Sequence, residues 1–282
     1  AMLALLLPLV ALVLCAGLLQ EEREQGRLGL VRVQSRHGLW PVLLAALGWR
    51  LLALWNVALI GSLPALLFDP GASVAVLVPW AAALGAFCAV WVILGGLLSW
   101  APISWAASML AALALWLALT FALPAALVLA AQKAAPMPSR LESIVAIRAA
   151  QHESEDNEQE LAQAWYDANP TIAAQLPAVW PASFLPRVLD QDLALESWAV
   201  DFAQARIDQA DIVAQGSWLS PGLALVLLGE RLAGTDVASH VRYLETVDAF
   251  EQRWRDFLIA RVMDRQGLRA DQLQQLPRFA PR

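Results

Sequence analysis

The residues best suited to acid–base or metal chemistry are scattered along the sequence. The histidines His37, His152 and His240 lie far apart, and no HExxH, GxSxG or paired-cysteine motif occurs. His152 precedes carboxylates that could bind a metal, but we favour a solvated acidic helix face. The only lysine, Lys133, follows no glycine-rich loop, so a Walker A site is absent from the sequence. We therefore expect no catalytic residue, metal site or cofactor in this chain, and we do not expect it to be an enzyme.

A charge-dense run is the stronger candidate for function. Residues 21–32, EEREQGRLGLVR, stand between two apolar segments, Met2–Leu19 and Leu39–Phe68. A bilayer core requires about 20 apolar residues per helical crossing, so this run is expected at a membrane face between two crossings. Its carboxylates and guanidinium groups can form charge-assisted hydrogen bonds with a soluble partner.

The elements that position this run are long apolar segments. Hydrophobic residues make up 59% of the chain, and only one formal charge lies between Leu51 and Gln132. We expect four crossings, of which the second is longer than one perpendicular span and has residues 39–48 as a tilted or interfacial lead-in. The crossings are Met2–Leu19, one within Leu39–Phe68, Val74–Leu98 and Trp105–Ala131.

Charge divides the chain into a membrane part and a soluble part. Residues 1–132 carry five arginines against four carboxylates, net +1, whereas residues 133–282 carry 14 basic against 21 acidic residues, net −7. Such an acidic soluble part argues against nucleic acid as a partner. The predicted fold class is an all-α membrane protein, with a polytopic transmembrane helical bundle (1–132) and a mostly helical extracytoplasmic domain (133–282).

The orientation follows from the arginines. The first connecting segment, residues 20–38, contains four of them, while the second and third connections contain no lysine or arginine. The positive-inside rule places residues 20–38 in the cytoplasm. After four crossings residues 133–282 then lie on the opposite side.

Helix signals punctuate the second half. Ser139 and Glu142 have the spacing of a capping box, and Ser154 is expected to open a helix through Asp167. Ser220-Pro221 is typical of an N-cap followed by a first-turn proline, in a helix expected to end at Gly234.

Arg50 is the one intramembrane charge that we single out. A charge inside a bilayer is a functional candidate. The alternative, which we favour, is that the guanidinium reaches the cytoplasmic interface while its stem stays among apolar groups.

The charged run also resembles a known family. Glu22-Arg23-Glu24-Gln25-Gly26-Arg27-Leu28, directly after an apolar crossing, is similar to the Glu-Arg-Glu-x-Gly-Thr-Leu pattern of ABC-2 type transporter permeases, with Arg27 where threonine is usual. A second set looks like the branch of these permeases that carries a large extracytoplasmic domain of unknown function. It comprises Pro138-Ser139-Arg140-Leu141-Glu142, Ser220-Pro221 and Leu232-Ala233-Gly234-Thr235-Asp236 with His240.

This resemblance implies the permease subunit of an exporter in the bacterial inner membrane, with residues 133–282 in the periplasm. It implies two separate ATPase chains that bind ATP and Mg, and a second permease subunit, identical or similar. Glu22, Arg23, Glu24, Gly26, Arg27 and Leu28 would couple the permease to the ATPase. The chain would be an internal portion of a longer subunit that has further N- and C-terminal helices. The alternative is a membrane scaffold or assembly factor without transport activity; an intramembrane enzyme fits less well because no catalytic constellation is present.

Overall fold

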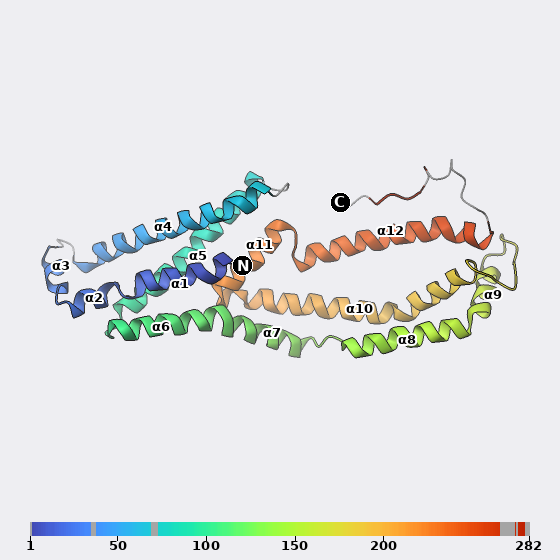
Figure 1. Ribbon diagram of the computed structural model, residues 1–282, viewed down its shortest axis with the longest axis horizontal. Helices are drawn as coiled ribbons and strands as arrows, with labels where there is room; N and C mark the ends of the chain where they lie inside the picture. Colours follow the sequence, from blue (N-terminus) through green and yellow to red (C-terminus); the bar gives the residue numbers. More distant parts are fainter. Residues whose placement is uncertain (1, 35–37, 69–72, 266–273, 275, 280–282) are drawn as a thin grey trace. The chain divides into compact units, whose positions relative to one another are not determined.

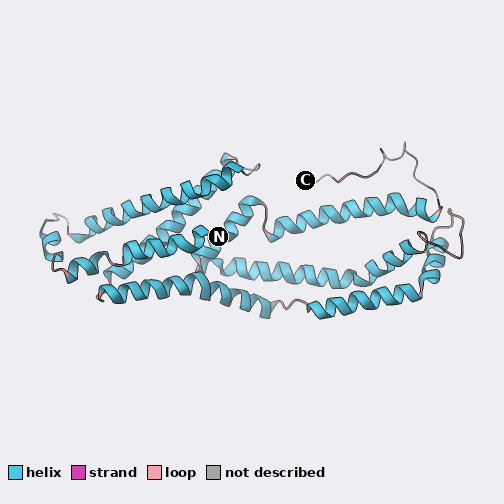
Figure 2. Cartoon of the chain, in the orientation of Figure 1, coloured by secondary structure: helices cyan, strands magenta, loops and turns pink. Residues whose placement is uncertain are grey.

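The computed structural model describes residues 2–34, 38–68, 73–265, 274 and 276–279, and the regular elements within them are all helical (Figures 1 and 2). The predicted all-α class is confirmed for this part of the chain. The helices are α1 (Met2–Ala16), α2 (Leu18–Glu24), α3 (Leu28–Gln34), α4 (Leu39–Phe68), α5 (Val74–Trp100), α6 (Trp105–Leu117), α7 (Leu123–Ala134), α8 (Arg140–Asp156), α9 (Glu158–Ala168), α10 (Phe184–Gly216), α11 (Pro221–Ala233) and α12 (Val237–Met263).

Within the described residues, four helical segments are long and apolar enough to cross a membrane. They are Met2–Glu24, Leu39–Pro64, Val74–Trp100 and Trp105–Ala134. The second is a single unbroken helix from residue 39, so the expected lead-in at residues 39–48 is continuous with its span. The four crossings predicted from hydropathy therefore correspond to four apolar helices of sufficient length.

The chain divides into two compact units. Unit 1 consists of Ala1–Ala131 and Ala210–Asp236, and unit 2 of Gln132–Gln209 and Val237–Arg282. The contacts thus group Ala210–Asp236 with the apolar helices, whereas the sequence suggested one boundary near residue 132. The reason is that α11 packs against α1 and α5 inside unit 1.

Unit 1 has an apolar core, to which side chains add hydrogen bonds to the backbone of neighbouring helices. Leu12, Leu84 and Trp91 are almost fully buried where α1 and α5 meet their neighbours. Ser108 Oγ of α6 donates a hydrogen bond to the Ala16 carbonyl oxygen at 2.6 Å. Small side chains and hydroxyl–carbonyl bonds are the means by which helices associate in lipid, where the surrounding acyl chains are as apolar as leucine.

A π-helical turn, Ala118–Ala122, interrupts the fourth apolar helix between α6 and α7. Inside this turn the Leu119 carbonyl accepts a hydrogen bond from Ser220 Oγ at 2.7 Å. Ser220 is fully buried, and its hydroxyl also accepts from the Leu223 N–H at 3.3 Å. One hydroxyl therefore caps α11, as the sequence predicted, and also fixes that helix to the fourth apolar helix.

Replacing Ser220 with alanine should destabilise unit 1 by about 1 kcal/mol. Interhelical hydrogen bonds in membrane proteins average about 0.6 kcal/mol, and a buried acceptor left unpaired adds to this loss. Thermal unfolding in detergent measures the change. The matched control is Ser217→Ala, because Ser217 Oγ donates to the Ala214 carbonyl of its own segment, at 2.7 Å, and not to the fourth apolar helix. Equal losses in both variants would contradict a stabilising contact across to Leu119.

Unit 2 contains α8, α9, most of α10, and α12. Tyr166, Ala182 and Met263 form its buried cluster, in which the Tyr166 hydroxyl donates to the Met263 carbonyl at 2.8 Å. Arg255 of α12 donates to Asp192 of α10 and thereby joins these two helices. The expectation that Ser154 opens a helix is wrong, because α8 continues to Asp156 and α9 starts at Glu158.

Candidate functional site

The charged run folds into two short helices at one end of unit 1. We call residues 18–34, which comprise α2, the turn at residues 25–27 and α3, the charged elbow (Figure 1, dark blue). Gly17 precedes it, and a Cβ there would lie 2.6 Å from Trp105 Nε1, so glycine permits the close approach of α6. Gly26 has φ +68°, a left-handed conformation that favours glycine and separates α2 from α3.

The start of the elbow is hydrogen-bonded to the end of α5. The Leu19 N–H donates to Ser99 Oγ at 2.8 Å, and Gln20 Nε2 donates to the Leu98 carbonyl at 2.8 Å. Gln20 and Ser99 are both fully buried. The Leu98 carbonyl lies in the last turn of α5 and also accepts from the Ala101 N–H at 3.1 Å, so Gln20 adds a second donor at this helix end.

Arg23 and Glu24 continue this pattern on the turn between α5 and α6. Arg23 donates to the Ala101 carbonyl at 3.1 Å and to the Trp100 carbonyl at 3.4 Å. Glu24 Oε1 accepts from the Trp105 N–H, the first of α6, at 2.8 Å. A cation thus lies at the C-terminus of one helix and an anion at the N-terminus of the next, which is the favourable arrangement for both helix dipoles. The two residues fasten the elbow to α5 and α6.

Other charged groups of the elbow face solvent. Glu22 and Arg27 form an ion pair at 3.2 Å, with side chains 34% and 52% exposed. Gln25 Nε2 donates to Glu21 Oε1 at 3.2 Å. Surface pairs of this kind contribute roughly 0–1 kcal/mol to stability, so they can be exchanged for contacts with another protein at low cost.

The second helix of the elbow adds apolar side chains. Leu28, at its start, is partly buried, whereas Leu30 and Val33 are 63% and 86% exposed. Exposed aliphatic groups beside an exposed ion pair suit either a lipid surface or a groove on a soluble partner.

The six predicted coupling residues therefore separate into two groups. Arg23 and Glu24 contact the α5–α6 turn, while Glu22, Gly26 and Arg27 lie on the solvent side and Leu28 begins α3. Contact of any of these residues with an ATPase stays a prediction.

Arg50 lies in α4 and is partly buried. Its Nη1 donates to the Ala46 carbonyl, one turn earlier in the same helix, at 3.1 Å. This bond satisfies one guanidinium donor within α4 itself. Its role in a bilayer stays a prediction.

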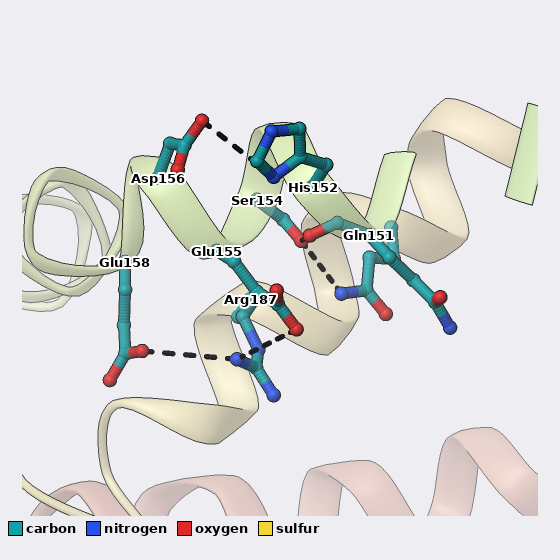
Figure 3. Close-up of polar contacts among 8 residues, drawn as sticks. Gln151, His152, Ser154, Glu155, Asp156, Glu158 and Arg187 are labelled. Carbon is teal, nitrogen blue, oxygen red and sulfur yellow. Dashed lines mark hydrogen bonds and ion pairs between the residues drawn. The ribbon is translucent and has the colours of Figure 1, made fainter. Parts of the chain in front are cut away.

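A polar cluster in unit 2 joins the α8–α9 break to α10 (Figure 3). Arg187 of α10 lies 3.6 Å from Glu155 and 3.9 Å from Glu158, between the two carboxylates. Nearby, Gln191 Nε2 donates to Ser154 Oγ at 2.6 Å. These contacts position α10 against both earlier helices.

The histidine predicted to stand on a solvated acidic face lies at the edge of this cluster. His152 Nδ1 is 3.9 Å from Asp156, and both side chains are largely exposed (Figure 3). Among the residues that the structure describes, no three His, Cys, Asp or Glu side chains are grouped so that they could hold a metal ion.

The predicted capping box at the start of α8 is confirmed. The Ser139 N–H donates to Glu142 Oε2 at 2.7 Å, and Ser139 Oγ accepts from the Glu142 N–H at 3.1 Å. The bond from the Ser139 backbone, with a further one from its side chain, lowers the pKa of Glu142. A carboxylate is favoured by donors that bind its charged form.

The contribution of this box should therefore depend on pH. Because the folded pKa is depressed, the contribution is present above the usual glutamate pKa and is lost as pH falls through the lower folded value. The Ser139 amide proton shift, measured by NMR, should titrate below the usual glutamate range. In Glu142→Gln this titration should vanish; a midpoint at or above the usual range in the unmodified protein would contradict the assignment.

Comparison with known families assigns the second half of the chain to a described domain family. A family model described as a domain of unknown function, DUF3526, matches residues 140–282, which is more than half of the 282 residues. The chain belongs to the DUF3526 family. The match begins at the first residue of α8 and includes α11, so the DUF3526 region contributes to both compact units. A search of curated proteins and a search of solved structures each found no match.

Sequence reasoning missed several positions in this DUF3526 chain. Gln20 and Ser99 escaped notice because their partners lie about 80 residues away, and the capping roles of Arg23 and Glu24 were missed for the same reason. The only available signal was a polar residue, Gln20, at the end of an apolar helix.

Proposed function

We propose that this chain is the transmembrane permease subunit of an ABC-2 type exporter in a bacterial inner membrane. Two copies of a separate ATPase chain bind ATP and Mg, and a second permease subunit, identical or similar, completes the transporter. Residues 20–38 face the cytoplasm in this proposal, and the DUF3526 region emerges on the periplasmic side.

The observation that carries the proposal is the attachment of the charged elbow to three apolar helices. The elbow continues from α1 and is hydrogen-bonded to the end of α5 and the start of α6. A force applied to the elbow therefore moves these helices together. Rigid-body motion of this kind can transmit a nucleotide-driven change across a membrane domain.

The solvent side of the elbow supplies the docking groups. Arg27 is exposed and Glu22 partly exposed, and the two are paired only with each other among the contacts that the structure describes; Leu30 and Val33 are exposed close by. Charged groups of both signs give orientation and specificity to a protein interface, while aliphatic groups fill a pocket. Glu24, by contrast, bonds the start of α6 and so holds the elbow against the apolar helices.

Co-purification in mild detergent tests the proposal. The native chain should retain a stoichiometric polypeptide that carries a Walker A loop and hydrolyses ATP. Glu22→Ala should weaken retention about tenfold, equivalent to ~1.4 kcal/mol, because a charge-assisted contact is lost. Glu160→Ala, which removes an exposed carboxylate in α9, is the matched control and should change nothing.

Two results would count against the transporter. Absence of any Walker-containing partner would favour the scaffold alternative. If such a partner is present and is retained equally by the native chain and by Glu22→Ala, Glu22 does not contribute to the interface, and the proposed docking through the elbow is contradicted.

A further inference from the structure

We propose that residues 212–229 enter the bilayer and return to the same face, as a re-entrant hairpin whose tip contacts lipid acyl chains. This inference requires the four apolar helices to cross a membrane but does not depend on the transporter function, so either proposal can fail without the other.

The sequence of this segment suits hydrocarbon but is divided into two limbs. Between Asp211 and Glu230 no Asp, Glu, Lys or Arg occurs over 18 residues. The chain breaks after Gly216, where a 3-10 turn, Ser217–Leu219, precedes α11. At 1.5 Å per residue the 13 residues of α11 extend about 20 Å, which is too short to cross a hydrocarbon core of about 30 Å.

Contacts show that the first limb runs inward along the fourth apolar helix. A Cβ at Gly216 would lie 2.5 Å from the Leu127 side chain, and four residues later Ser220 bonds the Leu119 carbonyl. Between these two points the partner on the apolar helix moves from residue 127 back to residue 119. Leu119 is at the middle of the Trp105–Ala134 segment.

The second limb runs back along α5. Pro221 and Trp218 share an apolar cavity of about 300 Å³ with Phe87, the middle residue of α5. Near the other end of α11, a Cβ at Gly229 would lie 3.3 Å from Trp80, close to the start of α5. The tip thus reaches the midpoints of two apolar helices, and the limb then returns toward the end where α5 begins.

Both limbs open to one face of the bundle. A short connection, residues 101–104, joins the end of α5 to the start of α6, so these two helix ends lie at one face. The start of α5 and the end of α7 therefore lie at the opposite face. The first limb comes from the α7 end and the second returns toward the α5 start, so entry and exit occur on the same side.

The break at the tip satisfies its own polar groups, as a break at membrane depth must. The Ser220 N–H donates to the Ser217 carbonyl at 3.0 Å, and the Ser220 carbonyl accepts from the Ala224 N–H at 2.9 Å. Ser217 Oγ bonds the Ala214 carbonyl, and Ser220 Oγ bonds Leu119. These four bonds serve backbone and side-chain groups of Ser217 and Ser220 at the turn.

The depth of the tip beside the apolar helices and its exposed apolar side chains indicate that lipid covers the surface around it. Trp218 is 76% exposed and Leu219 40% exposed, although they lie beside the midpoints of two apolar helices. At that depth the surrounding medium is acyl chain, and burial of these side chains in lipid is favourable where exposure to water would be costly.

Nitroxide accessibility in lipid nanodiscs tests the hairpin. In a Cys15→Ala, Cys88→Ala background, a spin label is placed by Trp218→Cys, by Thr235→Cys beyond the second limb, or by Leu110→Cys on an exposed position of α6. Collisions with oxygen report lipid, and collisions with a water-soluble nickel chelate report water. The ratio of oxygen to nickel collisions at position 218 should match position 110 and exceed position 235 several-fold.

Two outcomes would overturn the proposal. Nickel accessibility at position 218 equal to that at 235 would place the tip in water, and low accessibility to both reagents would mean that protein covers it. Should Trp218→Cys not reach the membrane, Leu219→Cys, also exposed at the tip, supplies the same measurement.

Discussion

Replacing Gly95 with alanine is expected to lower the free energy of unfolding of unit 1 by about 1–3 kcal/mol, the usual range for an overpacked helix contact. At Gly95, α5 lies close against α1. An alanine Cβ there would lie 2.7 Å from Cys15 Cβ and 3.5 Å from the Ala16 nitrogen. These atoms belong to the α1 backbone or lie next to it, so only displacement of a whole helix relieves the clash.

The neighbouring glycine provides a matched control. A Cβ at Gly96 would also meet an atom at 2.7 Å, but this atom is Leu47 Cδ1, the far end of a flexible side chain. Gly96→Ala should therefore cost much less than Gly95→Ala. Cys15 and Cys88 are both fully buried, so a thiol-reactive fluorogenic dye reports unfolding in a thermal ramp. Equal shifts in the two variants would contradict the packing at Gly95.

The second large effect is expected at Glu24. Its carboxylate accepts from the first N–H of α6, so Glu24→Ala leaves that donor without this partner and should cost about 1–2 kcal/mol, as loss of a helix cap does. Glu24→Gln keeps an acceptor and loses only the charge, which is worth about 0.3–1 kcal/mol near a helix N-terminus. The order native, Gln, Ala should appear in hydrogen-exchange protection of the Trp105 amide.

The Glu24 variants also distinguish residues that hold the elbow against α5 and α6 from residues that contact the ATPase. Glu24→Ala should loosen the α5–α6 turn and lower ATPase retention together, whereas Glu22→Ala should lower retention and leave Trp105 protection unchanged. Unchanged protection in Glu24→Ala would mean that the bonds of Leu19, Gln20 and Arg23 hold the elbow without Glu24.

Local signals made much of the helical structure predictable. The Ser139 capping box, the Ser220-Pro221 start and the Gly234 end of α11 each depend on residues within one helical turn. The four apolar helices were predictable for a similar reason, because length and hydropathy are properties of a continuous segment. The break between α8 and α9 was not, since no glycine or proline marks it.

Tertiary partners account for what the sequence did not reveal. Nothing in the sequence around Glu22, Arg23 and Glu24 indicates which of them contacts another helix. The roles differ because Arg23 and Glu24 bond the α5–α6 turn, whereas Glu22 pairs with Arg27. The grouping of Ala210–Asp236 with unit 1 was equally hidden, because two limbs of a broken apolar segment each fall short of the length that indicates a crossing.

Photo-crosslinking in intact cells tests the central claim, that the charged elbow docks an ATPase inside the cell, most directly. A benzophenone amino acid is placed at Gln25, exposed on the elbow, and in a second variant at Thr235, exposed after α11. We expect Gln25 to form an adduct with a polypeptide that contains a Walker A loop, identified by mass spectrometry, and Thr235 to form none. A Walker-containing adduct from Thr235, or its absence from Gln25 in a membrane where the chain is intact, would contradict the account.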